Sequence, residues 1–215
     1  MLKKNSLIFF LLLLTMILLM WGSNSKSQFE INWDRLDRSW RNFLKSPTPE
    51  NAKKVYLLLP KAKHINASEI HKHTATHDLI YYNLDVLEKR VKQLDENSVE
   101  LTFRLFPISD GAFTEYLTII LGDLTETNPK LLLEKVLEHH HLRECCLGHI
   151  ILNYGPDYYD NHKGSFYKTK KRIESMATVK EESLSELRDE CIKMLEEYLS
   201  ELKELLKKEN CSASH

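Results

Sequence analysis

Residues 178–205 read TVKEESLSELRDECIKMLEEYLSELKEL, a stretch in which apolar side chains recur at helical spacing. The recurrence is close to the seven-residue repeat of a coiled coil and predicts one long amphipathic helix. Thr178 and Glu181 have the spacing of a capping box, so we expect the helix to begin there. Such a helix packs either antiparallel on the preceding helix or on a second chain, and packing within the chain is favoured. The expected inward face consists of Leu184, Leu187, Cys191, Met194, Tyr198, Leu202 and Leu205.

Most of the chain before this helix shows the same period in shorter segments. Asn32 is the expected N-cap of a first helix, and Thr48 followed by Pro49 is expected to begin a second one that ends at Pro60. The segment 98–106 is predicted as a helix, although its alternation of apolar residues also fits a strand. Ser109 or Asp110, and Thr127 or Asn128, are the expected caps of two later helices. Helices are also expected over residues 78–94, 111–121, 129–137, 141–154 and 165–176.

Composition supports a helical fold. Glycine and proline are scarce, at 6 residues each, which disfavours a β-sandwich with many turns. The chain has 30 basic and 31 acidic residues, so it lacks the basic excess of a nucleic-acid-binding protein, and we expect no nucleic-acid partner.

The predicted fold class is therefore all-α. We expect a single domain of about eight short helices packed as helical hairpins, preceded by an apolar N-terminal helix. The domain is either α-solenoid-like or an irregular bundle. No repeat of fixed length is present, so the comparison with solenoids concerns architecture alone.

The N-terminal segment determines the expected compartment. Residues 7–21 read LIFFLLLLTMILLMW and follow Lys3 and Lys4, a pattern typical of export signals. The run is short for a membrane span, which favours a cleaved signal, but it lacks the small residues of a typical cleavage site, which favours an anchor. Both alternatives predict a protein that is secreted, periplasmic or anchored to the membrane with its domain outside the cytoplasm.

We expect four parts along the chain. Residues 1–25 are the signal peptide or membrane anchor, 26–31 a spacer, 32–208 the helical domain and 209–215 a flexible tail.

Four cysteines follow the leader, and an exported protein forms disulfides readily. A bond from Cys145 or Cys146 to Cys191 is the expected pairing, because adjacent cysteines rarely bridge without backbone strain. The alternative is that all four thiols, Cys211 included, are free.

A possible metal site comes from the spacing of His141, Cys145 and His149. Residues four apart lie on one face of a helix, and two such ligands are a geometry that zinc-binding helices use. The outer two are too far apart to share an ion without help, and His73 with His77 is the expected donor pair. Zinc is the predicted cofactor of this hypothesis. The simpler interpretation is a partly buried cysteine among solvated histidines.

Motifs of the common hydrolases and nucleotide-binding proteins do not occur in the sequence. Asp110 and Glu115 would serve as a pair of catalytic carboxylates, although Asp110 also fits a helix cap. Between residues 155 and 164 lies a turn-rich loop whose oxygen-bearing side chains would suit a cation. A surface for a sugar, peptide or phospholipid, or an ordinary solvated helix start, would be formed by Tyr158, Tyr159, Tyr167, Lys168, Lys170, Lys171 and Arg172.

The function predicted from these patterns is that of a non-catalytic interaction or scaffold protein of the cell envelope, with a protein partner. Contact with the membrane is expected through residues 7–21 if they are not cleaved. Two alternatives remain: a metal-binding envelope protein that uses the His/Cys cluster, and an envelope enzyme with an unrecognised carboxylate site. The sequence does not indicate which small molecule, if any, the protein binds.

Overall fold

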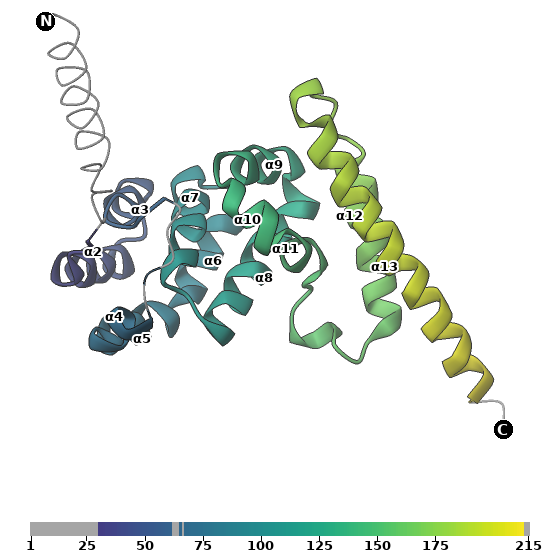
Figure 1. Ribbon diagram of the computed structural model, residues 1–215, viewed down its shortest axis with the longest axis horizontal. Coiled ribbons are helices and arrows are strands. Elements are labelled where there is room, and N and C mark those ends of the chain that lie inside the picture. Colours follow the sequence, from purple (N-terminus) through teal and green to yellow (C-terminus); the bar gives the residue numbers. More distant parts are fainter. Residues whose placement is uncertain (1–29, 62–64, 66, 213–215) are drawn as a thin grey trace, which may run out of the picture. The chain divides into compact units, whose positions relative to one another are not determined.

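The computed structural model describes residues 30–61, 65 and 67–212. Across this part of the chain it contains twelve α-helices, three short 3-10 helices and no β-strand (Figure 1). The all-α prediction is thereby confirmed. The elements are α2 Trp33–Lys45, α3 Pro49–Tyr56, α4 Ala67–Lys72, α5 Thr74–Tyr81, α6 Leu84–Lys92, α7 Glu96–Leu105, η1 Phe106–Ile108, α8 Gly111–Thr127, α9 Pro129–Glu138, α10 His140–Cys145, α11 Leu147–Leu152, η2 Pro156–Tyr158, α12 His162–Met176, η3 Glu182–Leu184 and α13 Ser185–Ser212.

The expected number of about eight helices is too low. The segments 78–94 and 141–154 are each divided between two helices, and α4 forms in a region where the sequence shows little pattern. Helices shorter than about ten residues carry few repeats of the apolar period, so adjacent short helices look like one in the sequence.

Side-chain caps begin three helices where the sequence predicts them. Each cap accepts a hydrogen bond from the backbone N–H three residues later: at 3.0 Å for Asn32, 3.3 Å for Thr48 and 3.1 Å for Asn128. Asn128 rather than Thr127 is thus the cap of α9. These bonds satisfy N–H groups that a helix leaves without a partner at its N-terminus.

Helix α7 is buried on every side from Ser98 to Leu105. It packs against α3, α6 and α8. Its apolar residues alternate with Ser98, Glu100, Thr102 and Arg104, which are polar but also buried. This alternation explains why the segment also resembled a strand. The strand alternative is wrong.

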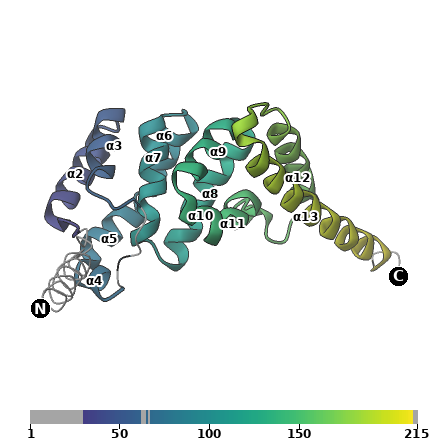
Figure 2. The ribbon, with the colours of Figure 1, turned by 45° about the horizontal axis from the view of Figure 1, so that its top comes forward.

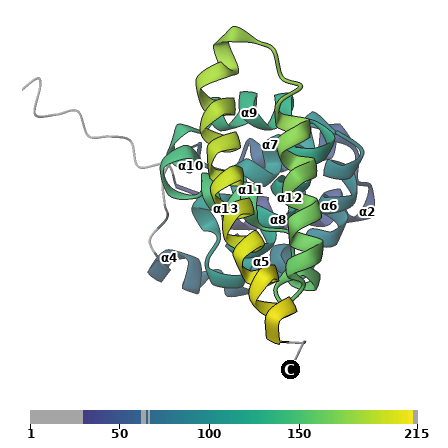
Figure 3. The same ribbon diagram turned by 90° about the vertical axis from the view of Figure 1, so that its right-hand side faces the viewer.

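Helices α12 and α13 form an antiparallel hairpin at the C-terminal end (Figure 3). The prediction that α13 packs within its own chain is therefore confirmed. The predicted start is wrong, because α13 begins at Ser185 after the η3 turn. The Thr178 hydroxyl instead donates to the carbonyl of Ser175 at 2.7 Å, at the end of α12. Helix α13 continues to Ser212, beyond the boundary expected at residue 208.

Helices that follow one another in the chain lie next to one another in the domain (Figure 2). The pairs are α2 with α3, α6 with α7, α8 with α9, and α12 with α13. One continuous apolar core joins them, from Ile31 before α2 to Leu195 in α13. The burial of one side of each helix thus holds the domain together.

Gly122 allows α8 and α11 to approach closely. A Cβ atom at this position would lie 2.8 Å from the carbonyl oxygen of Ile150 and 2.9 Å from that of Asn153. Any larger residue would push the end of α11 away from α8. This contact positions the loop after α11.

The predicted leader, residues 1–25, and nearly all of the spacer lie outside the described residues. Among the helices that the structure does describe, none combines the length and the apolar character needed to cross a membrane.

Candidate ligand-binding cleft

A cleft of about 600 Å³ is open to solvent beside the α12–α13 hairpin. Its lining comes from the first half of α8, from α11 and the loop that follows it, and from one residue each of α12 and α13. The volume falls in the range of sites for small molecules or a few side chains. The lining contains Glu115, His149, Asn153 and Cys146, together with the tyrosines Tyr154, Tyr158, Tyr159 and Tyr198.

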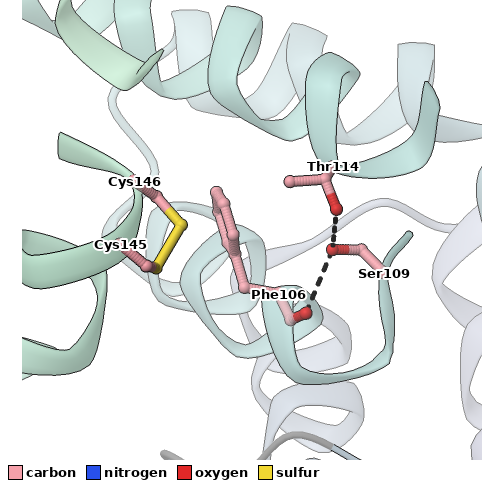
Figure 4. The surroundings of a disulfide bond; sticks show 5 residues. All are labelled: Phe106, Ser109, Thr114, Cys145 and Cys146. Carbon is pink, nitrogen blue, oxygen red and sulfur yellow. Dashed lines mark hydrogen bonds between the residues drawn. A yellow bond between two sulfur atoms is a disulfide. The ribbon is translucent and has the colours of Figure 1, made fainter. Parts of the chain in front are cut away.

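Helix α8 presents one face to the cleft. Gly111, Thr114, Glu115 and Thr118 are spaced so that they lie on the same side of the helix. The hydroxyls of Thr114 and Ser109 lie 2.8 Å apart and link the first turn of α8 to the segment before it (Figure 4). This link fixes the rim of the cleft.

Asn153 joins α8 to the loop after α11. Its Nδ2 donates to the Thr118 hydroxyl at 2.9 Å, and its Oδ1 accepts from the Gly155 N–H at 3.0 Å. Gly155 has φ +89°, a conformation that L-residues with side chains rarely adopt. The amide and the glycine together determine how the tyrosine-rich segment leaves α11.

Tyr154 lies between α12 and α13 at the back of the cleft. Its hydroxyl hydrogen-bonds the Thr169 hydroxyl at 2.7 Å, and its ring stacks with Tyr198 at a centroid distance of 6.3 Å. The guanidinium of Arg172 sits 4.1 Å from the centre of the same ring, a cation–π contact. Thr169, Tyr198 and Arg172 all come from the hairpin, and Tyr158 of η2 packs edge-on against the same ring at 6.0 Å.

Arg172 is fully buried and belongs to an ion network behind the cleft. Its Nη1 donates to the carbonyl oxygen of Ile151 at 2.7 Å, and its Nε lies 3.5 Å from Glu126. Lys168 and Lys171 also contact Glu126, at 2.9 and 3.0 Å. Burial lowers the pKa of Arg172. Burial raises the pKa of Glu126, but the hydrogen bonds from the two lysines outweigh it and the net pKa is lowered.

Glu115 is the carboxylate of the cleft. The Tyr159 hydroxyl donates a hydrogen bond to it, and this bond, more than burial, raises the pKa of Tyr159. No Lys, Arg or His within the described ranges lies within 4.0 Å of the Glu115 carboxylate. Glu115 and Glu126 thus differ, since one is open to solvent without a basic partner and the other holds three cations.

A disulfide joins the neighbouring residues Cys145 and Cys146, and Phe106 lies beside it (Figure 4). The pairing expected with Cys191 is therefore wrong, as is the alternative that all four cysteines are free. Cys191 is a buried thiol that faces the core, and Cys211 is an exposed thiol. The disulfide coincides with the break between α10 and α11, so one wall of the cleft begins at Cys146.

The helix expected to carry His141, Cys145 and His149 on one face is interrupted. Cys146 has φ −136° and ψ −5°, outside the helical range, so His149 does not follow His141 on a continuous helix. The Cys145 sulfur is bonded to Cys146. Zinc binding by this set stays a prediction, and it would require reduction of the disulfide.

The expected donor pair has other contacts: His73 is the N-cap residue of α5, and His77 lies within that helix. His73 stacks on Trp33 with ring centroids 4.8 Å apart. His77 packs edge-on against Phe113 at 5.2 Å, and its Nε2 lies 3.8 Å from Asp110. Neither histidine belongs to the one group of three side chains, among the described residues, whose ligand atoms are close enough together to hold a metal ion.

That group consists of Glu100, Glu138 and His139. Its central carboxylate already has protein partners, since Glu100 accepts from Arg104 at 2.7 Å and lies 3.2 Å from the ring of His139. Lys135 lies 3.3 Å away. A metal cation would have to displace these positive groups, so the cluster is better described as a buried ion network that joins α7 to α9.

The two carboxylates predicted as a pair do not both line the cleft. Glu115 lines the cleft, whereas Asp110 lies outside the lining and faces His77. In the turn-rich loop, the Asn161 side chain caps α12 by accepting from the Gly164 N–H at 2.8 Å. Of the three tyrosines predicted to form a surface, Tyr158 and Tyr159 line the cleft and Tyr167 does not.

Asn153, Tyr154 and Tyr198 line the cleft together, and this was not predicted from the sequence. Tyr198 was assigned to the apolar face of the last helix, and nothing in its local pattern shows that this face turns from core to cleft at that turn. The cluster of tyrosines after Gly155 was the available signal. Comparison of the chain with protein-family models, with curated proteins and with solved structures gives no match.

Proposed function

We propose that this chain is a non-catalytic helical binding protein whose tyrosine-lined cleft holds a segment of a protein partner. The observation that carries the proposal is the cleft itself, which is open to solvent and lined mainly by aromatic rings and uncharged polar groups. Tyrosine supplies a large, rigid contact surface with a polar tip, and it is enriched at protein interfaces for that reason.

The hydrogen bonding of the lining supports binding rather than catalysis. Asn153, Tyr154 and Tyr159 are each bonded to another protein group, which fixes their orientation. Cys146 is held in a disulfide and supplies no thiolate. A preformed surface of this kind reduces the side-chain entropy that a partner's binding must overcome.

The proposed architecture is α-solenoid-like, because successive helical hairpins lie side by side along the chain. Stacked hairpins offer extended surfaces that suit polypeptide partners. The proposed location is outside the cytoplasm, in the cell envelope or secreted, with a tether through residues 7–21 if these are not cleaved. The apolar leader supports export, and a disulfide is consistent with an oxidising compartment.

A peptide library tests the proposal. Twelve-residue random peptides displayed on phage are selected on the purified full-length chain, and the selected sequences are then measured against two variants. Thr114→Trp fills the cleft from α8, whereas Thr127→Trp places the same side chain on the same helix, outside the lining.

We expect selected peptides to bind the Thr114→Trp variant at least tenfold more weakly than wild type, and to bind the Thr127→Trp variant as wild type does. Equal binding to all three proteins would place the peptides elsewhere and contradict the proposal. Failure to select any peptide above background would also count against it. Circular dichroism and thermal melting establish that both variants fold.

A further inference from the structure

The charge of the cleft defines the chemistry of its ligand. The lining contains Glu115 and His149 but no lysine or arginine. Because Glu115 has no basic partner within 4.0 Å among the residues described, its negative charge is left for solvent or for a ligand. The other carboxylate near the hairpin, Glu126, is only 5% exposed and fully compensated by its three cations. It is therefore closed to a ligand.

The hydrogen bond from Tyr159 orients the Glu115 carboxylate so that it can bind a cation. The Tyr159 hydroxyl donates to one carboxylate oxygen, Oε1, and so leaves the second oxygen available as an acceptor. Tyr159 is 57% exposed as a residue, so an alkyl chain or a cation can lie across its ring. The rings of Tyr154 and Tyr158 already have cations on one side, from Arg172 at 4.1 Å and Lys168 at 5.6 Å. These cations lie toward Glu126, which neutralises them.

We infer that the cleft recognises a lysine or arginine side chain of the partner, with Glu115 as the acceptor of its charge and the Tyr159 ring as the surface for its alkyl stem. This inference rests on the proposed function, because the basic side chain is carried by the bound polypeptide segment. A cationic group forms a charge-assisted hydrogen bond with the free carboxylate oxygen.

Other ligand classes fit less well. An anionic group would approach a carboxylate in a lining without lysine or arginine, and like charges repel. An apolar side chain would cover Glu115 and remove water from its charge without replacing the lost hydrogen bonds, which is costly. The basic side chain is the one that gains from both parts of the lining, the aromatic rings and the carboxylate.

Four pentapeptides test the inference. They have the form acetyl-Gly-Gly-X-Gly-Gly-amide, in which X is lysine, arginine, norleucine or glutamate, so that norleucine matches the lysine stem without its charge. Each is titrated into ¹⁵N-labelled wild-type protein, into Glu115→Gln and into the control Glu50→Gln, and the amide shifts give the dissociation constant. Glu50 is an exposed carboxylate in the first turn of α3, and it does not line the cleft.

We expect the lysine and arginine peptides to bind wild type at least tenfold more tightly than the norleucine and glutamate peptides. This preference should fall by about tenfold in Glu115→Gln, as for the loss of one charged hydrogen bond, and stay unchanged in Glu50→Gln. Added salt should weaken the two basic peptides only.

Two results overturn the inference in distinguishable ways. If the peptides shift the cleft amides but norleucine binds as tightly as lysine, or Glu115→Gln binds lysine as wild type does, the charge recognition is wrong while the peptide-binding function stands. If none of the four peptides shifts any cleft amide, the proposed function fails together with the inference. Both glutamine variants replace exposed side chains, so their folding is readily verified by the same spectra.

Discussion

Replacement of Gly122 by alanine is the most direct perturbation of the contact that positions the cleft. The new Cβ would lie 2.8 Å and 2.9 Å from two backbone oxygens of the α11 segment, and 3.2 Å from Arg172 Nη2. The oxygens belong to the main chain, so they cannot move as a flexible side chain would. They must retreat by about half an ångström to reach ordinary contact distance.

The expected cost follows from this displacement. Overpacking of this kind costs about 1–3 kcal/mol, and the better helix propensity of alanine returns about 1 kcal/mol. The net loss of up to about 2 kcal/mol in the free energy of unfolding corresponds to a melting temperature lower by up to about 8 °C for a domain of this size.

Gly148→Ala is the matched control. It lies in α11, and no atom is within 4 Å of its added Cβ, so we expect it to raise the free energy of unfolding by up to about 1 kcal/mol. Thermal unfolding followed by circular dichroism compares the two variants with wild type. If Gly122→Ala melts above the temperature of wild type, as Gly148→Ala is expected to do, the close approach of α8 and α11 is not as described.

Other predictions concern the buried charges and the thiols. The pKa of Glu100 is lowered to about 2, because hydrogen bonds from His139 and Arg104 and the nearby positive charges outweigh a burial effect that raises it. The unfolded chain then binds a proton that the folded chain does not, so about 3 kcal/mol of stability, present above about pH 5, is lost as the pH falls toward 2. Urea unfolding at several pH values should show a shallower loss for Glu100→Gln, and an identical slope would contradict this. Arg172→Met should cost about 3–5 kcal/mol because it breaks a buried network, whereas Lys171→Met, at an exposed position, should cost less than about 1 kcal/mol in the same assay; equal costs would show that Arg172 is not buried. Burial raises the pKa of the Cys191 thiol to about 12. Iodoacetamide should therefore add one group to the native protein, at Cys211, two in urea and four in urea after reduction, as counted by mass spectrometry, and two groups on the native protein would refute the burial of Cys191.

The parts of the fold that depend on local pattern are predictable from sequence. The caps at Asn32 and Thr48 were identified from residue type and position, and Asn128 was one of two expected alternatives. This was possible because a cap is made by a side chain and an N–H group only three residues away. The packing of the last helix on its neighbour followed from its apolar face.

The breaks between helices were not predictable in the same way. Residues 141–154 keep a helical period across Cys146, and the interruption coincides with a disulfide that periodicity does not reveal. The start of α13 was placed too early, because Thr178 and Glu181 match a capping box in spacing but lie in a turn that ends α12.

The cleft could not be predicted from local sequence patterns, because its lining comes from segments that are far apart in the chain. Glu115 and Tyr159 are 44 positions apart. The hydrogen bond between them depends on how α11 and the loop after it pack against α8. The role of Gly122 was not predictable from sequence either. A glycine within a helix allows a close contact only if another segment packs against it, and the sequence does not show which segment does. Of the two carboxylates predicted as a pair, Glu115 lines the cleft and Asp110 lies outside its lining, and their catalytic role stays a prediction.

Hydrogen–deuterium exchange of the chain with and without a selected peptide tests the central claim most directly. If the cleft beside the α12–α13 hairpin is the binding site, the peptide should slow exchange in residues 111–118 and 146–159, and leave α2 and α3 unchanged. Protection confined to α2 and α3, or to any face outside these two segments, would contradict the account.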